Sequence, residues 1–299
     1  MRFVTFSPKA GQAHRVGVLR DGRVLDLADA ASRAGRALPF DPSDMVSLIE
    51  SGPEGRDAVR RVVGAAAGGV AVDDVRLHAP VPRPRKNVFC LGWNYLEHFK
   101  EGERIRQSGK EIPEYPVFFT KTVTAVTGPF DPIPYDPKVS DKIDWEVELV
   151  VVVGPGGKNI PEARAMDHVW GYTAMNDVSA RDLQRRHGGQ WFKGKSLDGA
   201  CPMGPCLVTA DEVDPNTLRV QTRVNGVSKQ DSNTKHFYFK IPRMLAELSL
   251  GMTLEAGDLV STGTPEGVGF GRTPPEFLKA GDLLETEIEG IGVLRNRVG

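Results

Sequence analysis

The chain has 299 residues, of which 40% are hydrophobic and 26% are charged, a composition typical of a folded globular protein rather than a disordered one. Its 38 basic and 39 acidic side chains give a formal net charge of -1, which argues against a nucleic-acid partner but allows an anionic small molecule in a locally positive pocket. The sequence shows neither an apolar run of roughly 20 residues nor a secretory signal pattern, so we expect a cytoplasmic protein with no membrane partner.

The N-terminal part of the sequence predicts a β-hairpin and a helix, and it carries no catalytic motif. Asp21-Gly22 separates two short apolar runs, at 15–19 and 24–27, and this pair is a strong hairpin signal. The alanine- and valine-rich stretch at 58–67 predicts a helix.

A proline-rich segment at 79–86, APVPRPRK, marks the predicted domain boundary. Proline has no N–H for a sheet and disfavours helix in the residue before it, so this segment is interpreted as a linker or an extended crossover. We therefore predict a small N-terminal α+β domain at 1–80 and a larger domain at 81–299.

Strand signals dominate the larger domain. They occur at 88–91, 117–119, 145–153, 169–175, 207–208, 218–224, 259–262 and 283–288. Helix signals are fewer, at 161–166, 179–186 and 242–248. Many closely spaced strands with few helices predict a β-rich α+β domain, rolled or sandwiched, rather than a doubly wound sheet.

The three cysteines do not suggest a disulfide framework or a zinc site. Cys90, Cys201 and Cys206 form no C-x-x-C pair, and their number is odd. We expect reduced thiols packed as small apolar groups.

The most informative segment is DWEVELVVVVG, which begins at Asp144. Side chains alternate along a strand, so Asp144, Glu146 and Glu148 are expected on one face, with the charged face ending where the valines enter the core. Neighbouring carboxylates repel unless a cation is present, and oxygen ligands favour Mg²⁺, Mn²⁺ or Ca²⁺ over Zn²⁺. The alternative is a solvated strand edge.

A second acidic position follows the predicted strand at 169–175. Asp177 precedes the predicted helix, on which Arg181 and Gln184 are expected to share one face with it. Arginine suits bidentate binding of a carboxylate, and glutamine offers both a donor and an acceptor. The alternatives are an N-cap role for Asp177 and a surface ion pair for Arg181.

Five segments together resemble the C-terminal domain of the fumarylacetoacetate hydrolase family. They are GWNYLEHFKEG, DWEVELVVVVG, GYTAMNDVSARDLQ, KGKSLDGACPMGP and GDLVSTGTPEGVG, in that order over roughly residues 80 to 299. The resemblance implies a mixed β-roll or β-sandwich catalytic domain, a homodimer, and a Mg²⁺ or Mn²⁺ site. The implied metal ligands are Glu146, Glu148 and Asp177, in agreement with the reading of the acidic strand.

The same resemblance implies the remaining site residues. His98 and Glu101 correspond to a catalytic dyad, whose i, i+3 spacing places both on one side of a helical turn. Lys195 corresponds to a pocket lysine that steadies an oxyanion or binds a substrate carboxylate. Gly263 and Thr264 resemble a backbone turn that binds an anion. Without the family pattern, an exposed histidine, an exposed lysine and an ordinary turn would be the simpler interpretations.

Two further positions carry over and two segments depart from the pattern. Arg181 and Gln184 are implied to be substrate contacts. The segment at 102–116 looks longer and more charged than in compact members, which leaves its behaviour as a lid open. Lys121-Thr122 stands where many members have Lys-Pro.

The leading functional prediction is hydrolysis of a C–C bond in a small anionic acylpyruvate-like diketo acid, such as fumarylpyruvate, in aromatic catabolism. In this scheme His98 and Glu101 activate a water while a metal-stabilised enolate departs. One alternative is an isomerase or decarboxylase of a 2-oxo or 2-hydroxy dienoic acid. Another is a non-catalytic metal- or anion-binding protein. A dinucleotide-dependent dehydrogenase is excluded because no G-x-G-x-x-G links a strand to a helix.

Overall fold

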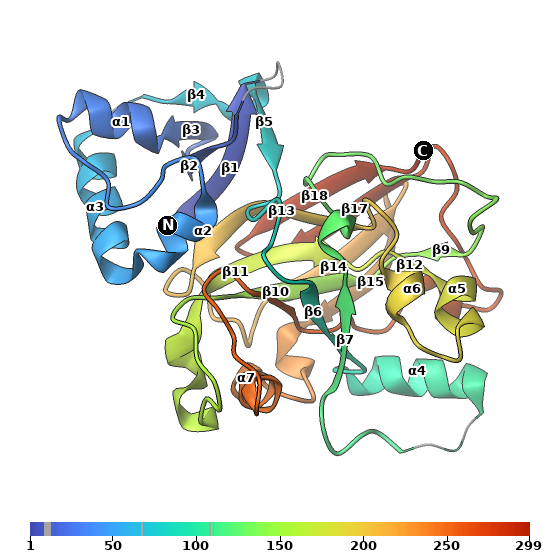
Figure 1. Cartoon of the computed structure of the whole chain (residues 1–299). Coiled ribbons are helices and arrows are strands. Elements are labelled where there is room, and N and C mark those ends of the chain that lie inside the picture. Colours follow the sequence, from blue (N-terminus) through green and yellow to red (C-terminus); the bar gives the residue numbers. More distant parts are fainter. Residues whose placement is uncertain (9–12, 67, 108, 110) are drawn as a thin grey trace.

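The computed structural model describes residues 1–8, 13–66, 68–107, 109 and 111–299. It has a large mixed sheet, a four-stranded antiparallel sheet packed against it, and helices around both (Figure 1). This arrangement confirms the predicted β-rich α+β class. Within the described residues, no helix is long and apolar enough to cross a membrane.

The N-terminal part contributes five strands and three helices. The strands are β1 (Arg2–Pro8), β2 (Arg15–Arg20), β3 (Arg23–Asp26), β4 (Val70–Ala71) and β5 (Val75–His78); the helices are α1 (Leu27–Arg33), α2 (Met45–Glu50) and α3 (Gly52–Ala65), with a 3-10 turn at Val72–Asp74. The predicted hairpin is confirmed, since β2 pairs with β3 and the turn residues Asp21 and Gly22 have φ values of 50° and 70°.

The predicted helix at 58–67 begins earlier than expected. It starts at Gly52 and includes Pro53 in its first turn. Proline is tolerated there because an N–H in the first helical turn has no partner within the helix. Residue 67 lies outside the described residues.

The large sheet continues from the N-terminal strands into the rest of the chain. Its further strands are β6 (Val88–Gly92), β7 (Val117–Lys121), β8 (Val126–Thr127), β10 (Val147–Val153), β11 (Val169–Asn176), β13 (Cys201–Thr209) and β16 (Leu259–Ser261). Strand β1 pairs antiparallel with β13, with Arg2 opposite Val208. The backbone ladder thus crosses the predicted boundary near residue 80, and the two-domain division remains a prediction.

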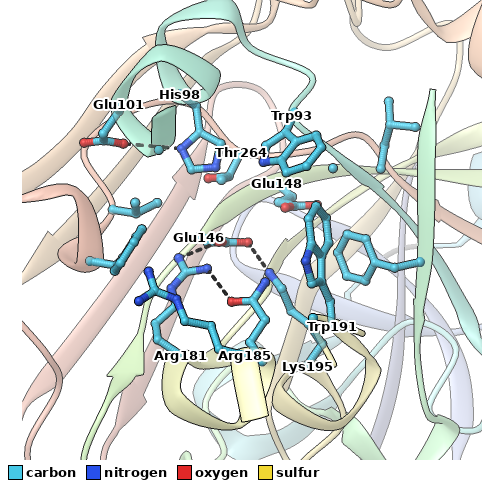
Figure 2. Close-up of a pocket in the computed structure, with 18 residues that line it drawn as sticks. Trp93, His98, Glu101, Glu146, Glu148, Arg181, Arg185, Trp191, Lys195 and Thr264 are labelled. Carbon is cyan, nitrogen blue, oxygen red and sulfur yellow. Dashed lines mark hydrogen bonds and ion pairs between the residues drawn. The ribbon is translucent and has the colours of Figure 1, made fainter. Parts of the chain in front are cut away.

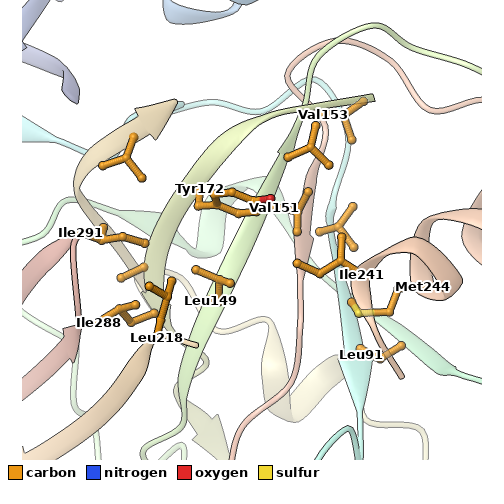
Figure 3. Packing of buried hydrophobic residues seen from close by; sticks show 14 of the residues in the cluster. Leu91, Leu149, Val151, Val153, Tyr172, Leu218, Ile241, Met244, Ile288 and Ile291 are labelled. Carbon is orange, nitrogen blue, oxygen red and sulfur yellow. The ribbon is translucent and has the colours of Figure 1, made fainter. Parts of the chain in front are cut away.

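The second sheet has the order β15–β14–β17–β18. Its strands are β14 (Arg219–Val224), β15 (Val227–Asn233), β17 (Leu283–Ile288) and β18 (Gly292–Arg297), and β9 (Ile143–Asp144) pairs separately with β12 (Ser179–Ala180). Leu149 and Tyr172 of the large sheet pack with Leu218 and with Ile288 of the small one in a single buried cluster (Figure 3). This core joins the two sheets and holds β10 and β11 rigidly between their neighbours.

Helices line the edges of this core. They are α4 (Leu96–Arg106), α5 (Arg181–Arg186), α6 (Phe192–Lys195) and α7 (Ile241–Ser249), with 3-10 turns at Val123–Ala125, Glu162–His168, Thr234–His236 and Gly269–Gly271. The helix expected at 161–166 is a 3-10 segment, and the one expected at 179–186 begins only at Arg181, after two residues of strand β12. All three cysteines are free and buried, as expected.

Candidate active site

Strand pairing brings the three predicted metal ligands together. Val147 is opposite Asn176 in the β10–β11 ladder, so Glu146, just before β10, meets Asp177, just after β11. The N–H of Asp177 donates to the carbonyl of Glu146 at 2.8 Å. One oxygen from each of Glu146, Glu148 and Asp177 lies within 4.8 Å of the others, and we call these three residues the acidic floor.

The acidic floor is buried, which corrects the sequence-based picture. The exposed fractions are 4% for Glu146, 2% for Glu148 and 0% for Asp177, so a solvated strand edge is excluded. The valines predicted that the face carrying Glu146 and Glu148 would be exposed up to the point where the strand enters the core. This prediction is wrong, because both glutamates already lie inside the protein. The predicted strand at 145–153 starts only at Val147, and Asp144 belongs to the separate strand β9.

Two buried lysines contact the acidic floor. Lys195 Nζ lies 2.6 Å from Glu146 Oε2 and 2.8 Å from Asp177 Oδ2, and Lys121 Nζ lies 2.7 Å from Asp177 Oδ1. Burial by itself would lower the pKa of Lys195, but Asp177 and Glu146 outweigh it and raise that pKa above its ordinary value. The Lys195 ammonium therefore stays charged beside the carboxylates.

The two glutamates of the acidic floor differ in their surroundings. Burial would raise the pKa of Glu146, but Lys195 and Arg181 outweigh it and lower the pKa to about 2. For Glu148, burial followed by repulsion from Asp177 and Glu146 raises the pKa well above its ordinary value. In the described part of the chain Glu148 has hydrogen bonds from Ser261 and from the Gly263 N–H at 3.1 Å, but no basic side chain within ion-pair distance. Glu148 is thus the carboxylate of the acidic floor that has no ion-pair partner in the described structure. A divalent cation that prefers oxygen ligands would supply the missing positive charge.

Arg181 lies beside the acidic floor rather than on the surface. Its Nε donates to Asp144 at 2.8 Å and its Nη2 to Glu146 at 2.6 Å, and it is 9% exposed. The surface ion pair considered for it is therefore excluded. Asp177 is neither on helix α5 nor its cap, since the cap residue is Ala180. The shared helix face predicted for Asp177 and Arg181 is wrong, because strand β12 separates the two.

The predicted dyad lies on helix α4 at one side of the pocket. His98 Nδ1 is 3.3 Å from Glu101 Oε2, and Glu101 Oε1 accepts the Gly267 N–H at 3.1 Å. A Cβ at Gly271 would approach Glu101 Cδ to 2.3 Å, so glycine is needed for this packing. Both dyad side chains are mostly buried, and Figure 2 shows them across the pocket from Arg181 and Lys195.

These groups line one cavity of about 350 Å³. Besides the dyad, Lys195, Glu146 and Glu148, its lining includes Arg181, Gln184 and Thr264, together with Trp93, Phe119, Arg185, Trp191, Val268 and Phe270 (Figure 2). Asp177 is not a lining residue and lies behind Lys195, which contacts it at 2.8 Å. Gly263 is not among the lining residues, and its N–H donates to Glu148. The predicted anion-binding turn is therefore represented in the pocket by Thr264.

The sequence did not indicate several of these neighbours. Lys121 was noted only as a departure from the family pattern, although a lysine that ends the apolar strand VFFTK is a usable signal. Asp144 was placed with the other acids but not with Arg181. Arg185 follows Gln184 directly, and its guanidinium lies 4.4 Å from the centre of the Phe270 ring. The partnership of Asp144 depends on contacts between distant segments, which no local pattern reveals.

Comparison with known proteins agrees with this geometry. The family model described as fumarylacetoacetate (FAA) hydrolase C-terminal matches residues 87–299. The oxaloacetate tautomerase YisK of Bacillus subtilis (strain 168) is 48% identical, over 94% of this chain and 95% of the relative. The mitochondrial oxaloacetate tautomerase FAHD2A of Homo sapiens is 43% identical, over 87% and 81%.

Solved structures share the whole fold. The fumarylacetoacetate hydrolase from psychrophilic Exiguobacterium antarcticum is 37% identical with a TM-score of 0.79, covering 100% of this chain and 99% of that one. The maleylpyruvate hydrolase from Sphingobium sp. SYK-6, in complex with manganese(II) ion and pyruvate, is 29% identical with a TM-score of 0.78, covering 100% and 98%.

The comparisons overturn the leading functional prediction. The curated relatives at 48% and 43% identity are oxaloacetate tautomerases, so the prediction of a C–C hydrolase is wrong and the isomerase alternative fits better. The buried acidic floor is a group that could hold a metal ion, as expected. On these findings the chain belongs to the fumarylacetoacetate hydrolase family, whose members are enzymes that act on ketonic substrates.

Proposed function

We propose that this protein is a divalent-cation-dependent tautomerase that interconverts the keto and enol forms of a small 2-oxo acid, with oxaloacetate as the first candidate. The observation that carries the proposal is that the His98–Glu101 dyad lines the same cavity as Glu146 and Glu148 of the acidic floor. The tautomerase names of the relatives at 48% and 43% identity support the reaction type.

The acidic floor fits the expected cofactor. Glu146, Glu148 and Asp177 would hold Mg²⁺ or Mn²⁺, since they offer only oxygen ligands and Glu148 has no basic side chain within ion-pair distance in the described structure. A bound cation would supply Lewis-acid stabilisation of negative charge on the substrate's C2 oxygen.

Basic side chains of the pocket would bind and orient the anionic substrate. Arg181 and Lys195 are held in place by their ion pairs with Glu146, and Arg185 extends the basic side towards Phe270. Gln184 accepts a hydrogen bond from Arg181 at 3.1 Å, which leaves its amide N–H groups as donors for a substrate oxygen. Two carboxylates of a dicarboxylic acid can thus be neutralised in one cavity.

The dyad would move the proton. The Glu101 carboxylate accepts, so His98 carries hydrogen on Nδ1 and presents the lone pair of Nε2. In the enol direction the C3–H bond breaks and its proton passes to Nε2, while its electron pair forms the C2–C3 double bond and the π pair of the C2 carbonyl moves onto the oxygen. Delivery of a proton to the C2 oxygen completes the enol and restores neutral imidazole. No water is added and no carbon–carbon bond breaks, so the reaction is an isomerisation.

The test is direct observation of tautomerisation. Enol oxaloacetate is added to protein loaded with Mn²⁺ or Mg²⁺, and to protein stripped with chelator, and loss of enol absorbance is followed. We expect acceleration only with the loaded protein. Pyruvate release is measured in the same samples, because its appearance at the same rate would indicate decarboxylation. No acceleration of either process, despite bound metal, would support the non-catalytic alternative.

Assembly as a homodimer and a cytoplasmic location stay predictions. Sedimentation equilibrium at micromolar concentration tests the first, since an interface of standard size should give about twice the mass of the chain. A monomer at that concentration would contradict the expectation.

A further inference from the structure

A buried glutamine outside the predicted site connects the acidic floor to Thr264. Gln230 is the one buried residue among the seven of strand β15, all of which the structure describes. It lies opposite Thr222 of β14, and both side chains are buried. A buried amide in such a place must have its hydrogen-bonding groups satisfied.

The direction of each hydrogen bond at Gln230 follows from its neighbours. The backbone N–H of Val147 can only donate, and it lies 3.1 Å from Gln230 Oε1, so this atom is the carbonyl oxygen. The Thr222 hydroxyl donates to the same oxygen at 2.9 Å. The other end is therefore the NH₂ group, which donates to Thr264 Oγ1 at 2.8 Å and to the carbonyl of Pro265 at 2.9 Å.

This arrangement settles what the Thr264 hydroxyl can do. Its oxygen accepts from Gln230, so its own hydrogen has to point elsewhere. Thr264 lines the cavity, and the Gln230 amide is the hydrogen-bond partner that its hydroxyl has in the described part of the chain. The O–H is thus turned into a donor for an acceptor inside the cavity, where the expected ligand is an anion.

We propose that Gln230 is a positioning residue that fixes the Thr264 hydroxyl as a hydrogen-bond donor to an oxygen of the bound 2-oxo acid. The inference rests on the proposed function for the identity of the anion. The same amide holds the N–H of Val147, the residue between the two glutamates of the acidic floor. Gln230, on the second sheet, therefore holds the Thr264 hydroxyl in a fixed position relative to Glu146 and Glu148.

The experiment is a double-mutant cycle read by binding. Pyruvate is titrated by calorimetry into the full-length protein loaded with Mn²⁺, because a relative has been solved with manganese and pyruvate. Thr264→Val removes the donor and should weaken pyruvate binding about 10- to 100-fold, as expected for a hydrogen bond to a charged group. Thr264→Ser keeps the hydroxyl and should bind nearly as the unmodified protein does.

Gln230→Glu should reverse the direction of the hydrogen bond between residue 230 and the Thr264 hydroxyl. Its second carboxylate oxygen would accept from the Thr264 hydroxyl and draw the hydrogen out of the cavity, so pyruvate binding should weaken to a similar extent. In the Thr264→Val background the same change should alter affinity by no more than about 2-fold, the ordinary error of additivity. A structural role, or repulsion by the new charge, would instead weaken binding equally in both backgrounds.

Two controls keep the result interpretable. Thermal unfolding and Mn²⁺ affinity are measured for every variant, and Gln230→Met, which removes the donor without adding charge, replaces Gln230→Glu if the latter does not fold. Normal pyruvate binding by Thr264→Val, or equal losses in both backgrounds, would overturn the inference. Failure to turn over oxaloacetate would contradict the proposed function alone, because the cycle measures pyruvate binding.

Discussion

The two sides of the cavity are built in different ways. The acidic floor is attached to β10 and β11, in the middle of the large sheet, and its side chains are sealed among the buried lysines and Arg181. The dyad is attached to α4, which also carries the solvent-exposed pair Glu97 with Lys100. One side thus depends on the core of the protein, and the other on a single helix fastened by Glu101 to the Gly267 N–H.

This difference separates two tasks of the site. Cation binding needs several charges fixed against their mutual repulsion, which only a rigid core provides. Proton transfer needs one histidine correctly oriented, which a single helical turn and one carboxylate can provide. Substitutions in the acidic floor should therefore affect metal binding, activity and stability together, whereas substitution of His98 should affect turnover alone.

The largest effect is expected from the acidic floor itself. Asp177→Asn or Glu146→Gln removes one of three ligand charges, so Mn²⁺ affinity should fall by at least about 100-fold, since even outer-shell partners contribute 10–100-fold. Tautomerase activity should be lost with the metal. Calorimetric titration with Mn²⁺ checks the affinity, and Glu285→Gln on β17, which removes a carboxylate outside the site, is the matched control. Unchanged affinity in both site variants would disprove the ligand set.

His98→Ala should produce the next largest effect, and on turnover alone. Loss of a positioned proton-transfer group should lower kcat by roughly 10²–10⁴-fold. Mn²⁺ affinity should stay the same, because His98 does not belong to the acidic floor. Steady-state kinetics with metal occupancy measured on the same samples is the check, and His236→Ala, at an exposed histidine away from the cavity, is the control. Near-normal turnover with full metal would mean that another group moves the proton.

Lys121→Met tests the stability side of the comparison. Removing the ammonium leaves Asp177 buried without one of its partners, so the free energy of unfolding without metal should fall by about 3–5 kcal/mol. The matched change on the dyad helix, Lys100→Met, breaks an exposed pair and should cost less than about 1 kcal/mol. Denaturant unfolding measures both. Adding Mn²⁺ should recover part of the loss at Lys121 and none at Lys100; equal losses would remove the contrast between the two sides.

Glu101→Gln should have the smallest effect on turnover. The amide keeps the side chain's size but loses the charge that orients and polarises His98, so kcat should fall about 10- to 100-fold and less than in His98→Ala. Combining the two substitutions should add little beyond His98→Ala, because Glu101 acts through the histidine. Rate measurements on the single and double variants test this. An additive loss would show that Glu101 also has a separate role, such as holding α4 at Gly267.

The site residues that could be predicted from the sequence are marked by patterns within a few neighbouring residues. The glutamates of the acidic floor are two positions apart before a run of valines, and His98 and Glu101 have helical spacing. The Asp21-Gly22 hairpin and most strands of the large domain are confirmed for the same reason, because turn chemistry and side-chain alternation act over a few residues. The resemblance of five ordered segments to one family then linked these local signals into a single predicted site.

The remaining features were decided by pairings between distant segments. Strand β7 brings Lys121 to Asp177, 56 residues further along the chain, and strand β15 brings Gln230 to Val147, 83 residues earlier. Alternation along a strand predicts only that Glu146 and Glu148 share a face. That this face is buried depends on Arg181 of α5, Lys195 of α6 and Lys121 of β7, which contact the acidic floor. The sequence by itself determined which side chains could do chemistry. The tertiary structure decided which of them meet, because strand order and sheet packing are set by the whole core rather than by any one segment.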